Sequence, residues 1–363
     1  MSELEGARKK INEIDEKMAK LFEERMEVAK TIALYKKEHG LSVKDHAREE
    51  EMIKRNRNFI DNNAIEGYYV DFLRSVVDLS CAYQSKVMNG LSVSFSGAEG
   101  AFGYIASKTL FPDAELKAFP DFVQAYRSVE KGDTDCVVLP IENSFAGDVG
   151  TVMDLMFSGD LYINQVIDID IVQNLLAVEG ATTDSIKTVV SHPQALEQCA
   201  EFIMDNGYDE ITYSNTALAA KYVKELNDKS IAAIASEDTA ELYGLKVLQK
   251  DINTSKNNTT RFAAFSRSQN KPVITGKRDN EHFILVYTVR NEAGALAQTL
   301  NIIGAHGFNM RSLRSRPMKD LLWSYYFYVE AEGNINTPNG RDMIQELSAI
   351  CAKLKLVGSY LDK

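Results

Sequence analysis

The hydrophobic pattern of the chain changes abruptly at Asn89-Gly90, and this change most constrains the fold. Before it, apolar residues recur at helical spacing, and no proline occurs until Pro112. After it, short apolar runs such as "LSVSFSG" and "CVVLPI" alternate with helical stretches. Helical periodicity predicts α-helices, whereas short strands that alternate with helices are typical of α/β domains. We therefore predict an all-α segment followed by a separate α/β segment.

A third pattern follows the polar stretch 267–281, which we interpret as a linker. The run "FILVYTVR" then predicts a first strand and "KLVGSY" a last one. Between them we expect two helices and two strands, near residues 295–305, 309–316, 321–330 and 338–352. This βαββαβ order is ferredoxin-like and belongs to the α+β class. The chain is thus expected to be multidomain, with domains at residues 1–89, 91–267 and 281–363.

Composition excludes several classes of function. The net charge of −11 argues against nucleic acid or an anionic membrane as the main partner. No apolar run is long enough to span a bilayer, and the start "MSELEGARKK" is charged and helical, unlike a signal peptide, so we expect a cytoplasmic protein. The four cysteines form no CxxC pair, and the five histidines lack metal-ligand spacing. With no P-loop and no GxGxxG, we expect neither a metal nor a cofactor.

Each predicted helix of the first segment carries polar residues where packing favours hydrocarbon. The first helix has a heptad ladder in which nine of ten positions are apolar: Leu4, Ala7, Ile11, Ile14, Met18, Leu21, Arg25, Val28, Ile32 and Tyr35. Arg25 should therefore point inward, and Lys36, eleven residues on, shares its face. In the second helix, polar residues continue the apolar stripe of Met52, Ile53, Phe59 and Ile60, namely Asp45, Arg48 and Glu49. In the third helix, Ser80 and Gln84 continue the apolar stripe in the same way.

Two interpretations of these polar residues are open. They could hold a bundle in register by buried ion pairs, because an unpaired buried charge is costly. They could instead line a small polar cavity. Its cations, Arg25, Lys36 and Arg48, exceed its carboxylates, Asp45 and Glu49, by one. If a second protomer adds Arg8, which lies on another helix face, the excess becomes two, and this would suit a small dicarboxylate.

The set Arg8, Arg25, Lys36, Asp45, Arg48, Glu49, Ser80 and Gln84 resembles the site of the all-helical chorismate mutases. The resemblance implies an intertwined dimer in which Arg8 reaches the partner's site and, with Arg25, holds the two carboxylates of chorismate. It implies that Lys36 and Gln84 contact the ether oxygen and that Asp45 and Glu49 fix the ring hydroxyl. Arg48 and Ser80 would complete the pocket. The residues expected to be catalytic are Lys36, Glu49 and Gln84.

The middle segment resembles the prephenate dehydratases in four motifs: "VVLPIENSFAG" at 137–147, "SHPQALEQC" at 191–199, "NTALAA" at 215–220 and "TTRFAAFS" at 259–266. The resemblance implies two α/β lobes like those of periplasmic binding proteins, with the substrate in the cleft. It also implies that prephenate loses water and carbon dioxide there to give phenylpyruvate. The glycine-rich turn at 97–103 departs from the family pattern and lacks two hydroxyl groups.

The resemblance assigns Thr260 an essential part, and its hydroxyl can donate a hydrogen bond to the leaving group. Strand alternation places Thr260 and Phe262 on one face and Arg261 on the other. Arg261 is therefore either a carboxylate-binding residue or part of a structural ion pair. The alternative acids are Glu142 and His192. The further residues expected to contact substrate are Asn143, Ser144 and Thr216.

The last segment resembles the ACT-type regulatory domains, through "GALA" at 294–297 and "SRP" at 315–317. The resemblance implies that phenylalanine binds at a dimer interface, near Gly294, Ala295, Leu296, Asn309 and Leu313. Arg311 and Arg314 stand where the family usually has Thr and Glu. Because a cation repels an amino-acid ammonium, we expect inhibition by phenylalanine to be retained but weakened.

Together these features predict a bifunctional enzyme of phenylalanine biosynthesis, acting on chorismate and prephenate as a homodimer or higher homo-oligomer. Two rival hypotheses remain. One is a ligand sensor that binds a dicarboxylate and an amino acid without catalysis. The other is an arogenate dehydratase, which would remove the same groups from an amino-acid substrate.

Overall fold

The computed structural model describes residues 3–43, 45–269, 280–318 and 324–361. The chain divides into two compact units. The helical unit comprises Met1–Ser92 with Asp113–Glu115, and the larger unit comprises Val93–Pro112 with Leu116–Lys363. Most of the expected linker, residues 270–279, lies outside the described residues. Among the described helices, none combines the length and the apolar character needed to cross a membrane.

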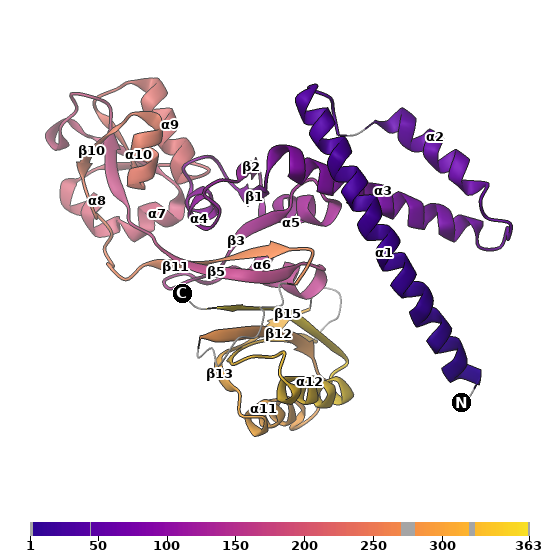
Figure 1. Ribbon diagram of the computed structural model, residues 1–363. Helices are drawn as coiled ribbons and strands as arrows, with labels where there is room; N and C mark the ends of the chain where they lie inside the picture. Colours follow the sequence, from indigo (N-terminus) through magenta and orange to yellow (C-terminus); the bar gives the residue numbers. More distant parts are fainter. Residues whose placement is uncertain (1–2, 44, 270–279, 319–323, 362–363) are drawn as a thin grey trace. The chain divides into compact units, whose positions relative to one another are not determined.

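The helical unit consists of α1 (Glu3–Glu38), α2 (His46–Arg57) and α3 (Glu66–Asn89). In Figure 1, α1 crosses α3 in its C-terminal half, and its N-terminal half extends beyond the other two helices. The crossing buries Ala29 and Ala33 of α1 and Leu73 and Val77 of α3. Small residues on α1 let the two helix backbones approach closely.

The apolar ladder of α1 does not pack within its own chain. Its exposed members are Leu4, Ile11, Ile14, Met18, Leu21, Val28 and Tyr35. Two residues of the expected α2 stripe, Phe59 and Ile60, are not helical, because α2 ends at Arg57 and Asn58 is its C-cap. Phe59 therefore lies outside the helix and is 70% exposed. Nothing among the described residues covers the first two-thirds of α1, which leaves a long apolar surface.

The larger unit contains two sheets. Its first lobe and C-terminal domain share a 10-stranded sheet of order β13-β14-β12-β15-β5-β11-β3-β1-β2, with β4 paired to β3. The first-lobe elements are β1 (Ser92–Ser96), α4 (Phe102–Leu110), β2 (Glu115–Phe119), α5 (Phe122–Lys131), β3 (Cys136–Asn143), β4 (Gly147–Asp148), α6 (Gly150–Ser158), β5 (Tyr162–Asp170) and β11 (Thr259–Ser266). Strand β11 is antiparallel to both β3 and β5, so it lies at the centre of this lobe.

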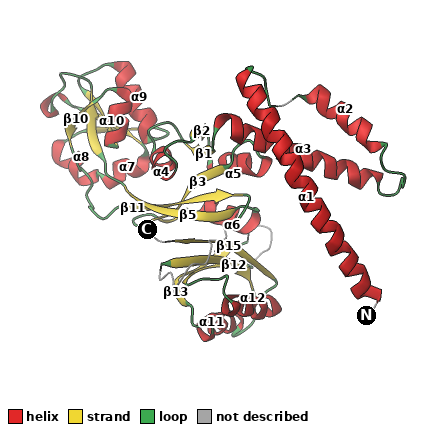
Figure 2. Ribbon diagram, viewed as in Figure 1, coloured by secondary structure: helices red, strands yellow, loops and turns green. Residues whose placement is uncertain are grey.

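The second lobe is built on a five-stranded sheet of order β10-β6-β9-β7-β8 (Figure 2). Its elements are β6 (Asn174–Ala177), η1 (Thr183–Ser185), β7 (Thr188–Ser191), α7 (Pro193–Gln198), α8 (Ala200–Asn206), β8 (Asp209–Thr212), α9 (Thr216–Leu226), β9 (Ile231–Ala235), α10 (Glu237–Tyr243) and β10 (Lys246–Gln249). The chain passes between the lobes twice, after β5 and before β11. Two lobes with a double connection confirm the expected two-lobed α/β fold.

The C-terminal domain has the expected βαββαβ order. Its elements are β12 (Glu281–Thr288), α11 (Ala295–Ala305), β13 (Asn309–Pro317), β14 (Tyr325–Glu332), α12 (Pro338–Ile350) and β15 (Lys353–Leu361). Its sheet shares a buried core with the first lobe, in which Val286, Tyr328 and Val357 pack with Met153 and Ile163. Strand β15 meets β5 where Gly358 pairs with Ile163. A Cβ at position 358 would collide with the Ile163 backbone, so this close approach requires glycine.

Candidate active sites

A cavity of about 460 Å³ lies among the three helices of the helical unit. Seven of the eight polar residues expected to form a site line it: Arg25, Lys36, Asp45, Arg48, Glu49, Ser80 and Gln84. They come from all three helices and from the turn before α2, where Asp45 is the N-cap and accepts from the Arg48 backbone N–H at 3.2 Å. The arrangement matches a polar cavity rather than a set of buried ion pairs.

The polar groups of this cavity are held by contacts that leave part of their capacity open. Arg25 donates to the Ser80 hydroxyl and, at 3.4 Å, to the Val76 carbonyl. Lys36 Nζ donates to the Val43 carbonyl at 2.6 Å, and the other protons of its ammonium remain available. Gln84 Oε1 is buried with no hydrogen-bond partner among the described residues. A buried amide oxygen that lacks a hydrogen-bond partner and lines a cavity favours a polar ligand.

Arg55 and Cys81 are among the lining residues of this cavity that were not foreseen from the sequence. Arg55 also lines it, so that four cations face two carboxylates and the excess is two without any help from Arg8. Cys81 lines it too, and its thiol lies 3.6 Å from Glu49 Oε1. Burial, and then the Glu49 carboxylate, raise the pKa of Cys81, so this thiol is not an activated nucleophile.

Arg8 does not line the cavity of its own chain. It is exposed on α1, seventeen residues before Arg25. At 1.5 Å per residue, the two residues are separated by about 25 Å along the helix. Arg8 can therefore reach a site of this kind only in another copy of the chain.

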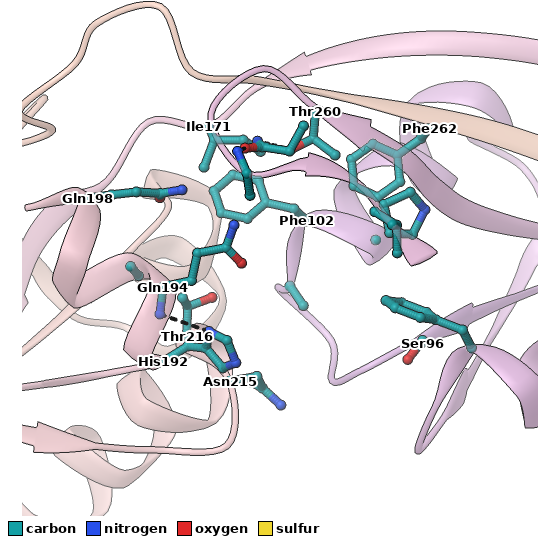
Figure 3. A pocket seen from close by; sticks show the side chains of 18 of the residues that line it. Ser96, Phe102, Ile171, His192, Gln194, Gln198, Asn215, Thr216, Thr260 and Phe262 are labelled. Atoms are coloured by element: carbon teal, nitrogen blue, oxygen red, sulfur yellow. Dashed lines mark hydrogen bonds between the residues drawn. The ribbon is translucent and has the colours of Figure 1, made fainter. Parts of the chain in front are cut away.

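A second cavity, of about 530 Å³, lies in the larger unit and is lined by both lobes (Figure 3). Five of the expected residues line it: Asn143, His192, Thr216, Thr260 and Phe262. The N-terminal ends of α4, α6 and α9 also reach it, through Phe102, Val149 and Thr216. Helix N-termini present backbone N–H groups and partial positive charge, so three of them together favour an anionic ligand.

Thr260 is held at this cavity by a fixed amide. Asn143 Oδ1 accepts from the backbone N–H groups of Phe145 and Ala146, at 3.0 and 2.8 Å. This fixes which end of the Asn143 side chain carries the NH₂ group. Its Nδ2 donates to Thr260 Oγ1 at 2.8 Å and to Asn258 Oδ1 at 2.8 Å. The Thr260 hydroxyl thus accepts one bond and, among the described residues, donates none, so its proton is free for a ligand.

His192 caps α7 and faces the same cavity, as Figure 3 shows. The ring accepts at Nδ1 from the backbone N–H of Gln194 at 3.3 Å. This bond requires an unprotonated Nδ1, which leaves the proton on Nε2. Burial lowers the pKa of His192, which also favours the neutral ring. His192 is therefore suited to donate a hydrogen bond rather than to act as a cationic acid.

Three of the expected substrate contacts do not line this cavity. Arg261 lies on the opposite face of β11 and pairs with Asp168 at 3.0 Å and with Glu330 at 3.4 Å, which is the structural alternative. Glu142 pairs with Arg314 at 2.6 Å. Ser144 Oγ donates to the Asn257 carbonyl and accepts from the Thr259 N–H, each at 2.9 Å. Alternation along β3 and β11 turns the residues next to Asn143 and Thr260 away from the cavity.

The charge of this second cavity differs from that of the helical one. Asp148 is the one carboxylate among its described lining residues, and no lysine or arginine is among them. An anionic ligand would therefore be held by neutral donors and helix ends. Across the described part of the chain, His, Cys, Asp and Glu form no group of three that could hold a metal ion.

The expected effector residues lie on two elements of the C-terminal domain. Gly294, with φ 83°, is the N-cap of α11, where Ala295 and Leu296 follow, while Asn309 and Leu313 are exposed on β13. Arg314 points to the other face of β13 and reaches Glu142 and Asp148 of the first lobe. The expectation that Arg314 faces the effector is therefore not supported by its position. Arg311 lies 3.3 Å from His282 Nε2 and 3.9 Å from Glu332.

Comparison with known families gives three matches in order along the chain. Residues 7–85 match the family described as chorismate mutase type II, residues 93–270 match prephenate dehydratase, and residues 282–348 match the ACT domain. The chain is 30% identical to a bifunctional chorismate mutase/prephenate dehydratase of Buchnera aphidicola from Acyrthosiphon pisum. That alignment covers 97% of this chain and 95% of the relative.

Two solved structures resemble the larger unit. One is a prephenate dehydratase from Arthrobacter aurescens in complex with L-Phe, with a TM-score of 0.68 and 26% identity over 75% of this chain and 90% of that chain. The other is GqqA, described as a novel type of quorum quenching acylase, with a TM-score of 0.68 and 28% identity over 75% of this chain and 98% of that chain.

The capping bond of His192 predicts a pH-dependent stability. Because its pKa is lowered in the folded chain, its contribution to the free energy of unfolding should be fully present above its ordinary value of 6.5 and lost as pH falls through the lowered pKa. His192→Asn keeps a capping side chain that does not titrate. Denaturant unfolding between neutral and mildly acidic pH should show the parent losing stability relative to the variant. Parallel curves would contradict the capping role.

Proposed function

The chain belongs to the family of bifunctional chorismate mutase/prephenate dehydratases, and we propose that it acts on chorismate and prephenate in two separate cavities. Chorismate rearranges to prephenate in the helical cavity. Prephenate loses water and carbon dioxide in the cleft of the larger unit. The observation that carries this proposal is the convergence of seven polar residues, distant in sequence, on one cavity with two excess positive charges.

The helical cavity suits a reaction that needs orientation and charge stabilisation only. In the rearrangement a C–O bond breaks as a C–C bond forms, so no proton is transferred and no nucleophile is needed. Arg25 and the other cations hold the carboxylates, which fixes the reactive conformer. Negative charge grows on the ether oxygen, where Lys36 and the Gln84 amide donate hydrogen bonds. Glu49 and Asp45 bind the ring hydroxyl at the N-terminal end of α2.

The cleft suits the dehydration because it offers a directed hydroxyl proton. The ring C–OH bond and the bond to the ring carboxylate break together, and the electrons of the second bond complete the aromatic ring. The leaving oxygen accepts the hydrogen bond and then the proton of Thr260, whose own oxygen is held by Asn143, and solvent water returns a proton to the Thr260 oxygen. The neutral His192 ring supplies a second donor at Nε2. Carboxylates of the substrate lie against the N-termini of α4, α6 and α9.

The ligand-sensor hypothesis, and an acylase activity like that named for GqqA, have less support. A ligand sensor without catalysis does not explain why Thr260 carries an unused proton in the cleft, beside the fixed Asn143 amide. An acylase would need a hydroxyl or thiol bonded to a base. In the described cleft, the His192 ring bonds the Gln194 backbone and no hydroxyl group. An arogenate dehydratase remains the nearer alternative and is taken up below.

A dimer completes the mutase site in this proposal. The exposed ladder of α1 presents an apolar stripe along a helix that extends beyond its own unit, and such a stripe packs against a second copy. Arg8 lies in the same part of α1, on another face than the stripe, about 25 Å from Arg25 along the helix axis. We infer that Arg8 enters the partner's cavity and that the chain is a homodimer or a larger homo-oligomer.

Phenylalanine is the proposed effector, bound near Gly294 and the outer face of β13. Because Arg314 is engaged with Glu142 and Asp148 and faces the other way, it does not repel the ammonium of phenylalanine. Inhibition by phenylalanine should then depend on Arg311 and on backbone groups at the start of α11. The enzyme would serve phenylalanine biosynthesis and would be inhibited by the final product of that pathway.

Replacing Lys36 should separate the two activities. Lys36→Ala removes the ammonium at the ether oxygen, and we expect mutase turnover to fall by about 100-fold or more while prephenate dehydration stays near normal. Lys37→Ala, on the adjacent exposed position, is the matched control and should leave both rates unchanged. The measurement is the conversion of chorismate alone, followed to prephenate and to phenylpyruvate. A parent-like mutase rate in Lys36→Ala would refute this site.

Replacing Thr260 should have the reverse effect. Thr260→Val keeps the branched shape but removes the hydroxyl proton, so dehydration should fall about 100-fold or more while chorismate still becomes prephenate. Thr259→Val removes a neighbouring hydroxyl that bonds Asp170 instead, and it should dehydrate prephenate at the parent rate. If Thr260→Val keeps the parent rate, the proton must come from another group, and the role given to Asn143 also fails.

Mixed dimers test the shared mutase site. Arg8→Ala and Lys36→Ala chains should each be inactive alone, but a mixed dimer has one site with both residues intact. Refolding the two variants together should restore about a quarter of the parent mutase activity, since half the dimers are mixed and each has one working site. Lys36→Ala with Gln84→Ala is the control and should show no recovery, because both residues act in their own chain's site. No recovery in the first mixture would show that Arg8 does not act across the dimer.

A further inference from the structure

We propose that Arg314, on strand β13 of the C-terminal domain, determines the substrate charge that the dehydratase cleft accepts by neutralising Asp148. A neutralised Asp148 favours the dianion prephenate, whereas a free Asp148 favours arogenate, its amino-acid analogue. This inference rests on the proposed dehydratase function. It assigns a specificity role to a side chain that does not itself line the cleft.

The guanidinium of Arg314 is fixed by two carboxylates of the first lobe. One terminal nitrogen lies 2.6 Å from Asp148 Oδ1 and the other lies 2.6 Å from Glu142 Oε1. The guanidinium carbon also lies 5.4 Å from the ring centroid of Tyr328, a fully buried residue of β14. The Arg314 side chain is only 19% exposed. A planar guanidinium held on two edges and one face has little freedom to turn away.

Asp148 brings this ion pair to the cleft. It belongs to β4, and it lines the cavity together with its neighbours Gly147 and Val149. It is the one carboxylate among the described lining residues, which include no lysine or arginine. The charge that the cleft presents to a ligand therefore depends on whether a cation outside the cavity offsets the negative charge of Asp148. Arg314 provides this balance from a different domain of the chain.

The two candidate substrates differ where this charge matters. Both carry a carboxylate on the ring, but the side chain of prephenate ends in a keto acid and that of arogenate in an amino acid. An unbalanced Asp148 would repel the carboxylates and attract the ammonium of arogenate. Burial raises the pKa of Asp148, and the neighbouring Glu142 acts in the same direction, while Arg314 and, more weakly, Arg316 oppose both. Loss of Arg314 would leave two adjacent carboxylates with no cation between them.

The same strand offers a matched control. Arg316, two residues further along β13, also crosses to the first lobe and pairs with Asp154 of α6 at 3.3 Å. Asp154 does not line the cleft among the described residues. Replacing Arg316 therefore removes an ion pair between the same two parts of the chain, with a smaller effect on Asp148, on which Arg316 acts more weakly than Arg314 does.

The test compares Arg314→Gln and Arg316→Gln in the full chain. For Arg314→Gln we expect the KM for prephenate to rise about tenfold with a smaller change in kcat, and the ratio of kcat/KM for arogenate to that for prephenate to rise by at least as much. For Arg316→Gln both values should change much less, because Arg316 acts on Asp148 more weakly than Arg314 does. Mutase activity, which arises in the separate helical unit, and the melting temperature report on folding.

A charge rescue keeps the proposal falsifiable if Arg314→Gln is destabilised. Asp148→Asn combined with Arg314→Gln should bring the KM for prephenate back towards the parent value, because the unbalanced charge is removed. Equal losses for Arg314→Gln and Arg316→Gln, or no recovery in the double variant, would overturn the specificity role in favour of a domain-docking contact. If the parent itself does not dehydrate prephenate, the proposed function fails instead, and this is seen before any variant is compared.

Discussion

The pairing of β11 with both β3 and β5 is the constraint on which the larger unit depends. It brings a late segment of the chain into the centre of a sheet formed by much earlier residues. One face of β11 then presents Thr260 and Phe262 to the cleft, and the other presents Arg261 to Asp168 and Glu330. The strand is a wall shared by the cleft and the C-terminal domain, and Arg261 joins the two through Asp168 and Glu330.

In the proposed mechanism, the two cavities bind dianions by different physical means. The helical cavity uses side-chain cations, which can be placed on three helices and which also stabilise charge that develops during the reaction. The cleft uses helix ends and neutral donors, and no lysine or arginine is among its described lining residues. Cations in the larger unit lie behind the cavity wall instead, where Arg261 and Arg314 are paired with carboxylates.

Periodic signals carried most of what could be predicted from the sequence. The inward polar residues of the helical unit follow from a period of 3.6, and the two faces of β11 follow from a period of two. The features that were missed depend on contacts between distant segments. Asn143 and Thr260 are 117 positions apart, and Glu142 and Arg314 are 172 apart. Phe59 misled the helix prediction because one capping residue, Asn58, ends α2 before it.

The exposed N-terminal half of α1 has a consequence for how the two activities respond to protein concentration. This half buries no side chain against its own chain within the described residues, so little besides helix propensity holds it in place. The larger unit, in contrast, has extensive cores of its own. In the proposed dimer, dilution would first separate the copies joined through α1, and the mutase site would lose its order while the dehydratase cleft stays intact. The balance between the two reactions would then report the amount of enzyme present.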